Sequence, residues 1–338
     1  MTTPDAPRYG VAVVSGGSAG VGRAIVRALA DKGWDVAVLA RGRAGLDGAL
    51  KDIENAGRRG LAISTDVAEL GKVEAAAEQV EDELGPISLW VNVAFVGALR
   101  FFWDTPDDVY RRITDVTYHG QVNGTRVALS YMRPRNRGVI VQVGSALAFR
   151  GIPLQSAYCG AKHAVMGFTE SVITELRHEK SAVRVCMLQL PALNTVQFDW
   201  NDSEFDEHPM PVPPIFGPEV AARAVAYLAD HPRRTMWVGP STALTIVANR
   251  LAPSVLDRYL GKTGVKSQLS KQDGPRFGSN LFVPRDDDAD RGAGGMFTDK
   301  AHGRDPWSAA SMQRLPVLAA SAAVGSIAAG LWRRNRLH

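Results

Sequence analysis

Short apolar runs rich in Val, Ile and Leu recur along the first 240 residues, and polar stretches of helical length separate them. Runs of this kind are typical of buried strands. We predict strands at residues 9–15, 34–40, 60–64, 87–92, 138–144, 183–190 and 235–239, and helices that include 21–32, 72–84, 217–230 and 244–260. Strands that alternate with helices form a parallel sheet covered on both faces, and its ligands bind at the C-terminal ends of the strands. The pattern therefore predicts an α/β fold with a doubly wound, Rossmann-like sheet of seven parallel strands.

The same pattern divides the chain into three parts. Residues 1–262 hold all seven predicted strands and form the expected catalytic domain. Residues 263–307 are polar, Gly-rich and aperiodic, which predicts a partly disordered linker. Residues 308–338 are expected to form an Ala-rich helix with a basic end, and the stretch Leu315 to Trp332 carries no charge. Two alternatives stay open for this helix: contact with a membrane on the cytosolic side, and packing on its own protein.

Composition and charge narrow the classes of protein. The chain has 39 basic and 35 acidic residues, and a net charge of +4 that is scattered in this way does not indicate nucleic-acid binding. Cys159 and Cys186 both fall in predicted core elements, which favours free thiols in a reducing compartment. Because no apolar export signal precedes the first strand, we expect a cytoplasmic protein. No His or Cys spacing indicates a metal site, and the acidic run 286–290 lacks the glycine and glutamate of a calcium loop.

A glycine-rich turn connects the first predicted strand to the first helix, over residues Ser15 to Gly22. Gly16, Gly20 and Gly22 permit a tight turn and a close approach of the backbone, and the amides at the helix N-terminus attract pyrophosphate. The spacing Gly-x-x-x-Gly-x-Gly differs from the general Gly-x-Gly-x-x-Gly fingerprint. The turn therefore predicts a dinucleotide site of a variant type.

The end of the second predicted strand indicates which dinucleotide binds. An acidic residue there would hold the adenosine ribose hydroxyls, whereas this chain has Ala40 followed by Arg41. A guanidinium suits a 2′-phosphate, so we predict NADP(H) as the cofactor, with a solvated surface arginine as the alternative. Asp66, after the third strand, is expected either to accept a hydrogen bond from the adenine amine or to cap the following helix.

Three side chains with the chemistry of hydride transfer follow the fifth predicted strand. Ser145 stands at the end of that strand, and Tyr158 and Lys162 are four residues apart, which places them on one face of a helix. A nearby ammonium would lower the pKa of the phenol and make Tyr158 a general acid or base. Ser145 would hold the oxygen of a carbonyl or carbinol by a hydrogen bond.

With the glycine-rich turn, Asn92-x-Ala94, Ser145 and Tyr158-x-x-x-Lys162 in this order, the chain resembles the short-chain dehydrogenase/reductase family over about residues 8–260. The resemblance implies that the last three of these side chains are catalytic and that Lys162 also holds the nicotinamide ribose. It further implies a homo-oligomer. The full set of expected cofactor-binding residues is Ser15, Gly16, Ser18, Gly20, Val21, Gly22, Arg41, Asp66, Val67, Asn92, Ala94, Tyr158, Lys162, Pro191 and Thr195.

Three positions depart from the family's pattern. The family's Asn-Asn-Ala-Gly is here Asn92-Val93-Ala94-Phe95, so the bulk of Phe95 needs room. Thr117 stands at the position of the family's fourth catalytic residue, an Asn, and a hydroxyl does not replace both the carbonyl and the amide of Asn. The family's Pro-Gly becomes Pro191-Ala192, and the threonine expected near the carboxamide comes one residue early as Thr195.

These residues predict an NADP(H)-dependent oxidoreductase that interconverts a carbonyl and an alcohol, with Tyr158 as the acid or base. Aromatic residues after the fourth and sixth strands, Phe101 to Trp103 and Trp200, favour an apolar small-molecule substrate, although they suit loop packing as well. Thr117 and Phe95 leave open the alternative of a dinucleotide-binding sensor or scaffold without turnover.

Overall fold

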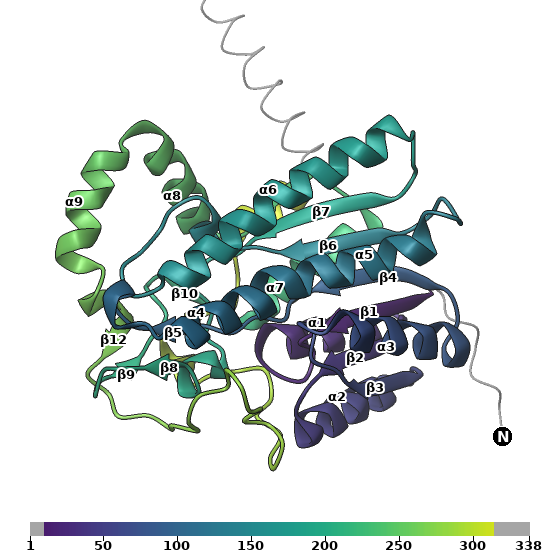
Figure 1. Ribbon diagram of the computed structural model, residues 1–338, viewed down its shortest axis with the longest axis horizontal. Coiled ribbons are helices and arrows are strands. Elements are labelled where there is room, and N and C mark those ends of the chain that lie inside the picture. Colours follow the sequence, from purple (N-terminus) through teal and green to yellow (C-terminus); the bar gives the residue numbers. More distant parts are fainter. Residues whose placement is uncertain (1–9, 314–338) are drawn as a thin grey trace, which may run out of the picture.

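A seven-stranded parallel sheet forms the centre of the molecule (Figure 1). The computed structural model describes residues 10–313. From one edge to the other the strands are β3 (Gly60–Ser64), β2 (Asp35–Ala40), β1 (Val11–Ser15), β4 (Ile87–Asn92), β6 (Val139–Val143), β7 (Arg184–Gln189) and β11 (Thr235–Trp237). The order reverses between β1 and β4, which is where open α/β sheets bind their ligands. The prediction of a doubly wound sheet of seven parallel strands is confirmed.

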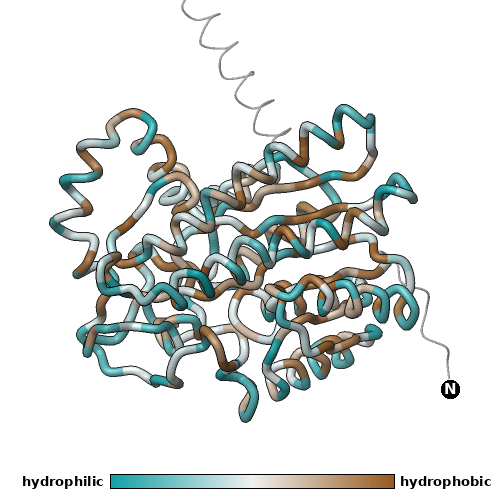
Figure 2. Tube along the Cα trace, viewed as in Figure 1, coloured by the Kyte–Doolittle hydropathy of each residue, from teal (hydrophilic) through white to brown (hydrophobic). Residues whose placement is uncertain are grey.

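Helices cover both faces of the sheet. On one face lie α1 (Gly20–Asp31), α2 (Arg43–Asn55) and α7 (Pro218–Asp230); on the other lie α3 (Leu70–Glu83), α4 (Asp107–Thr114), α5 (Gly120–Met132) and α6 (Ser156–His178). Strand β1 shows how the sequence sets this arrangement, because successive side chains of a strand point to opposite faces. Ala12 and Val14 pack with the first group of helices, whereas Val11 and Val13 pack with the second. The strands are therefore apolar along most of their length, as the brown strand traces in Figure 2 show.

The helix expected at residues 244–260 is two helices, α8 (Pro240–Leu251) and α9 (Pro253–Thr263), which lie beside one end of the sheet (Figure 1). The break falls at Pro253, because proline has no N–H to donate and disfavours helical geometry in the residue before it. Ala252 accordingly has φ −145° and ψ 59°.

Short elements complete the fold beyond the C-terminal ends of the main strands. The two-stranded pairs are β5 (Ala98–Leu99) with β8 (Asp202–Ser203), β9 (His208–Pro209) with β12 (Leu269–Ser270), and β10 (Ile215–Phe216) with β13 (Ala301–His302). Single helical turns are η1 (Phe102–Asp104), η2 (Asp115–His119), η3 (Ala146–Ala148), η4 (Val196–Asp199), η5 (Lys266–Gln268) and η6 (Thr298–Lys300), and η2 is a π-turn that joins α4 to α5.

The segment 263–307, which we expected to be a partly disordered linker, instead packs against the sheet domain. Its strands β12 and β13 pair with β9 and β10, and a short helix, α10 (Pro306–Met312), follows it. We call residues 277–297 the strap; they run as the yellow-green trace at the bottom of Figure 1. Arg23 of α1, which is 1% exposed, holds Asp290 of the strap through two hydrogen bonds of 3.0 and 3.2 Å. The strap is fixed by these polar and backbone contacts and by three separate buried side chains, Leu281, Ala293 and Phe297, which do not recur with a helical or strand period.

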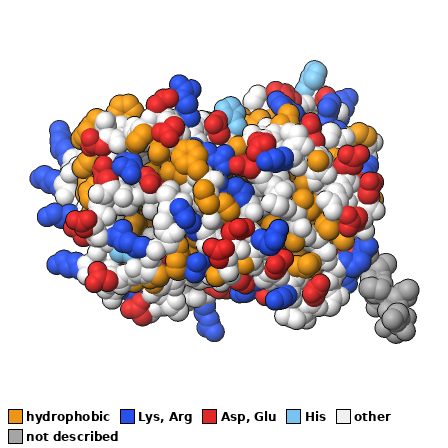
Figure 3. Space-filling view, turned by 60° about the horizontal axis from the view of Figure 1, so that its bottom comes forward, with side chains coloured by type: hydrophobic (Ala, Val, Ile, Leu, Met, Phe, Trp, Pro, Cys, Tyr) orange, Lys and Arg blue, Asp and Glu red, His pale blue; other side chains and the backbone are white. Residues whose placement is uncertain are grey.

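The surface and the cysteines agree with the composition. Lys and Arg side chains are interspersed with Asp and Glu on the face shown in Figure 3. Cys159 and Cys186 are buried and unpaired. Within residues 10–313, none of the helices has the length and apolar character needed to cross a membrane. The stretch Leu315 to Trp332 lies outside the described residues, so its proposed membrane contact stays a prediction.

Candidate active site

The glycine-rich turn between β1 and α1 has a backbone that only glycine fits. Gly16 and Gly20 have φ values of +73° and +56°, in the left-handed region that glycine adopts at little cost. A Cβ at Gly16 would lie 2.7 Å from the Cα of Ala94, and a Cβ at Gly22 would lie 2.0 Å from the carbonyl oxygen of Gly16. The turn therefore brings the N-terminus of α1 against the ends of β1 and β4, where its amides face the cleft.

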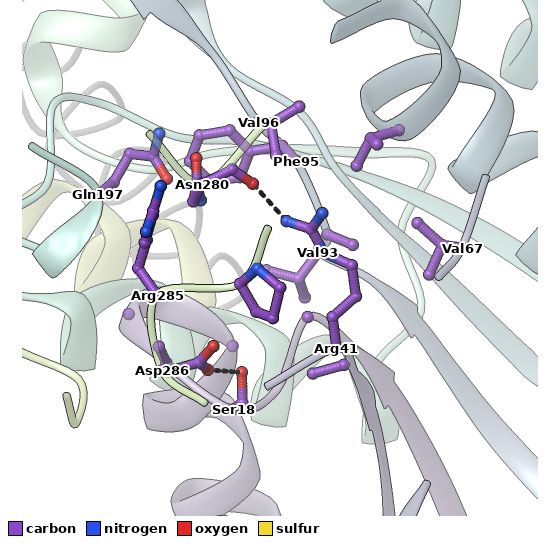
Figure 4. Close-up of a pocket in the computed structure, with 18 of the residues that line it drawn as sticks. Ser18, Arg41, Val67, Val93, Phe95, Val96, Gln197, Asn280, Arg285 and Asp286 are labelled. Carbon is purple, nitrogen blue, oxygen red and sulfur yellow. Dashed lines mark hydrogen bonds between the residues drawn. The ribbon is translucent and has the colours of Figure 1, made fainter. Parts of the chain in front are cut away.

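A cleft of about 120 Å³ lies at the C-terminal ends of the strands on both sides of β1 (Figure 4). Ten of the expected cofactor-binding residues line it: Gly16, Ser18, Gly20, Val21, Gly22, Arg41, Asp66, Val67, Ala94 and Thr195. Its lining also includes Phe95 and Trp200, which the sequence analysis named without placing them in the cofactor site. Further lining residues that were not assigned to the site include Val93, Val96, Val116, Gln197, Asn280, Pro284, Arg285 and Asp286. The last four belong to the strap, which no local motif connected with the site.

Five residues of the expected set are not part of this lining: Ser15, Asn92, Tyr158, Lys162 and Pro191. Asn92 is fully buried in a polar network, where its amide nitrogen donates to Gln142 Oε1 at 2.9 Å and its oxygen accepts from Trp90 Nε1 at 2.8 Å. The hydroxyl of Ser15 accepts a hydrogen bond from the N–H of Val93 at 3.2 Å. Both side chains therefore hold the ends of β1 and β4 in place, and Pro191 likewise does not line the cleft.

Arg41 and Asp66 stand at the adenosine end of the cleft. The alternative of a solvated surface arginine is wrong, because Arg41 donates to the backbone carbonyls of Asn280 and of Leu281, the latter at 3.0 Å. Burial lowers the pKa of Arg41, as does the nearby Arg112, while Asp66 opposes the shift. Asp66 accepts from the N–H of Ala68 at 3.0 Å, so it caps the turn before α3, and Arg112 holds its other oxygen at 2.5 Å.

The structure brings Ser145, Tyr158 and Lys162 to the C-terminal end of β6. Ser145 precedes η3, and its hydroxyl accepts the N–H of Leu147 at 3.1 Å, which fixes the direction of the side chain. Tyr158 and Lys162 lie in the first two turns of α6, and Lys162 Nζ is 5.6 Å from the centroid of the Tyr158 ring. Lys162 is 1% exposed and donates to the carbonyl of Val143 at 2.7 Å.

The pKa of Tyr158 differs from the expectation. Removal of the phenol from water raises its pKa above the ordinary value, and the hydrogen bond with Ser145 offsets only part of that shift. The predicted lowering of this pKa by Lys162 is therefore wrong for the chain as described. Burial also lowers the pKa of Lys162 to about 7, because no carboxylate compensates for the loss of hydration.

Two of the departures from the family pattern now have a structural account. The Thr117 hydroxyl donates to the carbonyl of Val96 at 3.1 Å and accepts from its N–H at 3.2 Å, so one hydroxyl serves both polar groups of that residue. This bond ties the π-turn η2 to the loop after β4. The ring of Phe95 stands edge-on to Tyr158, with 5.7 Å between the ring centroids, and Lys162 Nζ lies 5.7 Å from the Phe95 centroid.

A doubly wound sheet with a glycine-rich first crossover and a Ser, Tyr and Lys at its C-terminal edge defines a class of protein, the dinucleotide-dependent α/β oxidoreductases. Comparison with known proteins places the chain more closely. Residues 10–204 match the model of the short chain dehydrogenase family, which covers more than half of the chain. The chain belongs to this family and is an oxidoreductase of it, as the sequence motifs indicated. In the described part of the chain, no group of three or more His, Cys, Asp or Glu side chains is placed to hold a metal ion.

Individual relatives agree with this assignment. The chain is 29% identical over 329 residues to "Uncharacterized oxidoreductase YxnA" of Bacillus subtilis (strain 168), covering 96% of this chain and 91% of that protein. It is 32% identical over 227 residues to a human 3-oxoacyl-[acyl-carrier-protein] reductase, covering 66% of this chain and 92% of that protein. An alcohol dehydrogenase from Thermococcus sibiricus, complexed with 5-hydroxy-NADP, superposes with a TM-score of 0.60 over 68% of this chain and 95% of that chain. At 22% identity, that last likeness shows the fold alone.

Proposed function

We propose that this protein interconverts a carbonyl and an alcohol by hydride transfer with NADP(H). The observation that carries the proposal is the convergence of Ser145, Tyr158 and Lys162 at the same sheet edge as the glycine-rich turn. Together they place a hydrogen-bond donor, a phenol and an ammonium beside a cradle for a dinucleotide. A sensor without turnover would not need Ser145, Tyr158 and Lys162 to lie together.

The residues around the turn fit a nicotinamide dinucleotide. The glycine backbone and the N-terminus of α1 suit the pyrophosphate, because the amides there have no partner within the helix. Arg41, which lines the cleft after β2, would hold the 2′-phosphate, and Lys162 would hold the nicotinamide ribose. When bound, the nicotinamide supplies or accepts the hydride.

The chain's own residues handle the oxygen and its proton. Because its pKa is raised, the Tyr158 phenol is protonated at neutral pH, which is the form that donates a proton to a carbonyl oxygen. Ser145 would donate a hydrogen bond to the same oxygen while it gains charge. Burial lowers the pKa of Lys162 to about 7, and its Nζ lies 5.6 Å from the centroid of the Tyr158 ring, so Lys162 would be the neighbouring group that returns a proton to Tyr158.

Aromatic side chains on the loops after β4 and β7 support an apolar substrate. Phe101 and Trp103 stack with 5.1 Å between their ring centroids, and Trp103 remains 75% exposed. Trp200 lines the cleft itself. These rings offer contact area to an apolar ketone or aldehyde at the edge of the sheet. The proposal further includes a cytosolic homo-oligomer, and for residues 308–338 it keeps two alternatives, contact with a membrane surface and packing on the protein itself.

The test measures binding before turnover. NADPH and NADH are titrated against the purified chain, Arg41→Ala and Arg177→Ala, the last being an exposed control on α6. We expect Arg41→Ala alone to weaken NADPH and to leave NADH nearly unchanged. Binding of neither nucleotide would refute the proposal at its root.

Turnover is then followed as NADPH oxidation with a panel of apolar ketones and aldehydes. Tyr158→Phe should lose roughly 10² to 10⁴-fold in rate and still bind NADPH, because the phenol oxygen acts only on the substrate's proton. Tyr259→Phe is the matched control, since Tyr259 is 59% exposed on α9. A Tyr158→Phe variant with full turnover would exclude Tyr158 as the acid, and NADPH binding with no turnover on any panel member would favour the sensor.

A further inference from the structure

The strap crosses the part of the cleft proposed for the adenosine and the pyrophosphate. At the adenosine end, the carbonyls of Asn280 and Leu281 accept the guanidinium of Arg41. At the pyrophosphate cradle, the N–H of Gly20 donates to the carbonyl of Gly292 at 2.9 Å. Gly20 is one of the amides expected to face the pyrophosphate, so a strap carbonyl already uses the hydrogen bond that a phosphate oxygen would take.

The N-terminus of α2 is satisfied in the same way. The N–H of Arg43 donates to Asp287 Oδ1 at 2.9 Å, that of Ala44 to the Asp287 carbonyl at 3.2 Å, and that of Gly45 to the Asp286 carbonyl at 2.9 Å. The first amides of a helix normally point at water or at an anion. Helix α2 begins two residues after Arg41, so these amides border the region proposed for the 2′-phosphate.

One strap carboxylate enters this region directly. Asp286 is 6% exposed, and its Oδ2 accepts the hydroxyl of Ser18 at 2.6 Å, as Figure 4 shows. A Cβ at Gly42 would lie 2.0 Å from one of its oxygens, and a Cβ at Gly45 would lie 2.3 Å from the other. The carboxylate therefore fills a space that two glycines of the β2–α2 turn leave free, beside Ser18 of the glycine-rich turn and within the electrostatic reach of Arg41.

We propose that Asp286 determines nucleotide choice by occupying the subsite of the adenosine 2′-phosphate, so that NADP(H) binds only when the strap withdraws from Ser18 and α2. The inference rests on the proposed function and adds a residue, Asp286, that opposes the binding of NADP(H). A carboxylate and a phosphate do not bind together in one buried subsite, because the two negative charges would repel each other with little water to screen them. The cleft of about 120 Å³ beneath the strap is also smaller than the ~300 Å³ or more of ordinary ligand sites, so the strap has to move for any dinucleotide.

Binding of the 2′-phosphate and binding of the rest of the dinucleotide then require different groups of the strap to be displaced. Either nucleotide has to displace the carbonyl of Gly292 from Gly20, whereas only the phosphorylated one also has to displace the charge of Asp286. Removing that charge should therefore favour NADPH selectively. This difference separates Asp286 from a residue that merely holds the strap closed.

The test compares Asp286→Asn with Asp288→Asn, which removes the same charge from an exposed position of the same strap. Dissociation constants for NADPH and NADH are measured by titration with both variants and the wild-type chain. We expect Asp286→Asn to bind NADPH roughly tenfold more tightly, the scale of one charge-assisted hydrogen bond, with NADH changed much less. Asp288→Asn should match wild type for both nucleotides.

A second readout follows the contact of the strap with α2 by hydrogen exchange. Saturating NADPH should speed exchange of the backbone amides at 43–45 in the wild-type chain, because these amides donate to Asp286 and Asp287 and lose those partners when the strap leaves α2. Slower exchange, or an Asp286→Asn variant that loses NADH affinity, would overturn the inference and make Asp286 a ligand of the ribose hydroxyls. Unchanged binding in Asp286→Asn overturns the inference alone, whereas no binding of either nucleotide to any of the three proteins overturns the proposed function with it.

Discussion

The buried Lys162 makes the stability of the fold depend on pH in a defined direction. Its side chain is 1% exposed, and burial lowers its pKa from the ordinary 10.5 to about 7. In the unfolded chain the amine keeps its ordinary pKa, so between these two values the unfolded state holds a proton that the folded state has released. Stability rises with pH wherever the unfolded state binds more protons. The cost of burying this ammonium is therefore complete below pH 7 and disappears toward pH 10.5.

The size of the effect follows from the two pKa values. One pKa unit corresponds to ~1.4 kcal/mol, so the whole cost amounts to roughly 5 kcal/mol, and the part recovered between pH 7 and pH 9 is roughly 2 kcal/mol. This loss of stability accompanies a catalytic use of the lysine, because a buried lysine amine exchanges its proton near neutral pH and an exposed one does not. Replacement by an apolar side chain of similar length should remove both the cost and its pH dependence.

The assay is urea unfolding at pH 7 and pH 9 of the wild-type chain, Lys162→Met and Lys51→Met, an exposed control on α2. On going from pH 7 to pH 9, Lys162→Met should gain roughly 2 kcal/mol less unfolding free energy than the other two proteins. Burial raises the pKa of Cys159 and of Cys186 to about 11, and the contribution of these thiols to the pH dependence is the same in all three proteins and cancels in the comparison. The same pH dependence in all three proteins would refute the reasoning.

Two further predictions concern the departures from the family pattern. Thr117→Val should lower the unfolding free energy by ~1–3 kcal/mol in urea, because it leaves both polar groups of Val96 unpaired, and Thr117→Ser should restore most of it. Equal losses in the two variants would contradict this account. Phe95→Gly, which frees space beside Tyr158 and Lys162, should strengthen NADPH binding severalfold in a titration, with the exposed Phe102→Gly as control. Weaker binding would instead make the Phe95 ring part of the nucleotide site.

Local patterns predicted most of the fold, because each strand of this sheet is a short apolar run and each crossover fits within a few tens of residues. The glycine-rich turn was also predictable, since its backbone geometry excludes side chains at Gly16 and Gly22. The helical spacing of Tyr158 and Lys162 placed both on α6. What spacing did not predict is the balance of burial and charge around them, which raises the pKa of Tyr158 instead of lowering it.

The roles of Asn92 and Arg112 needed the structure for a different reason. Asn92 stands where the family pattern suggests a cofactor contact, yet its partners Trp90 and Gln142 come from its own strand and the neighbouring strand β6. Arg112 reaches Asp66 across 46 positions of sequence. Side-chain partners of this kind depend on which strands and helices become neighbours, and a single sequence does not specify their geometry.

The sequence by itself determined the sheet, the position of the glycine-rich turn and the candidates for proton transfer, because hydrophobic period, glycine geometry and helical spacing act over a few residues. Only the tertiary structure decided the place of the strap. Ser18 and Asp286 are 268 positions apart, and nothing in the polar, aperiodic stretch around Asp286 indicates a partner. Its place depends on hydrogen bonds to amides of α1 and α2 that exist only once both helices are packed on the sheet.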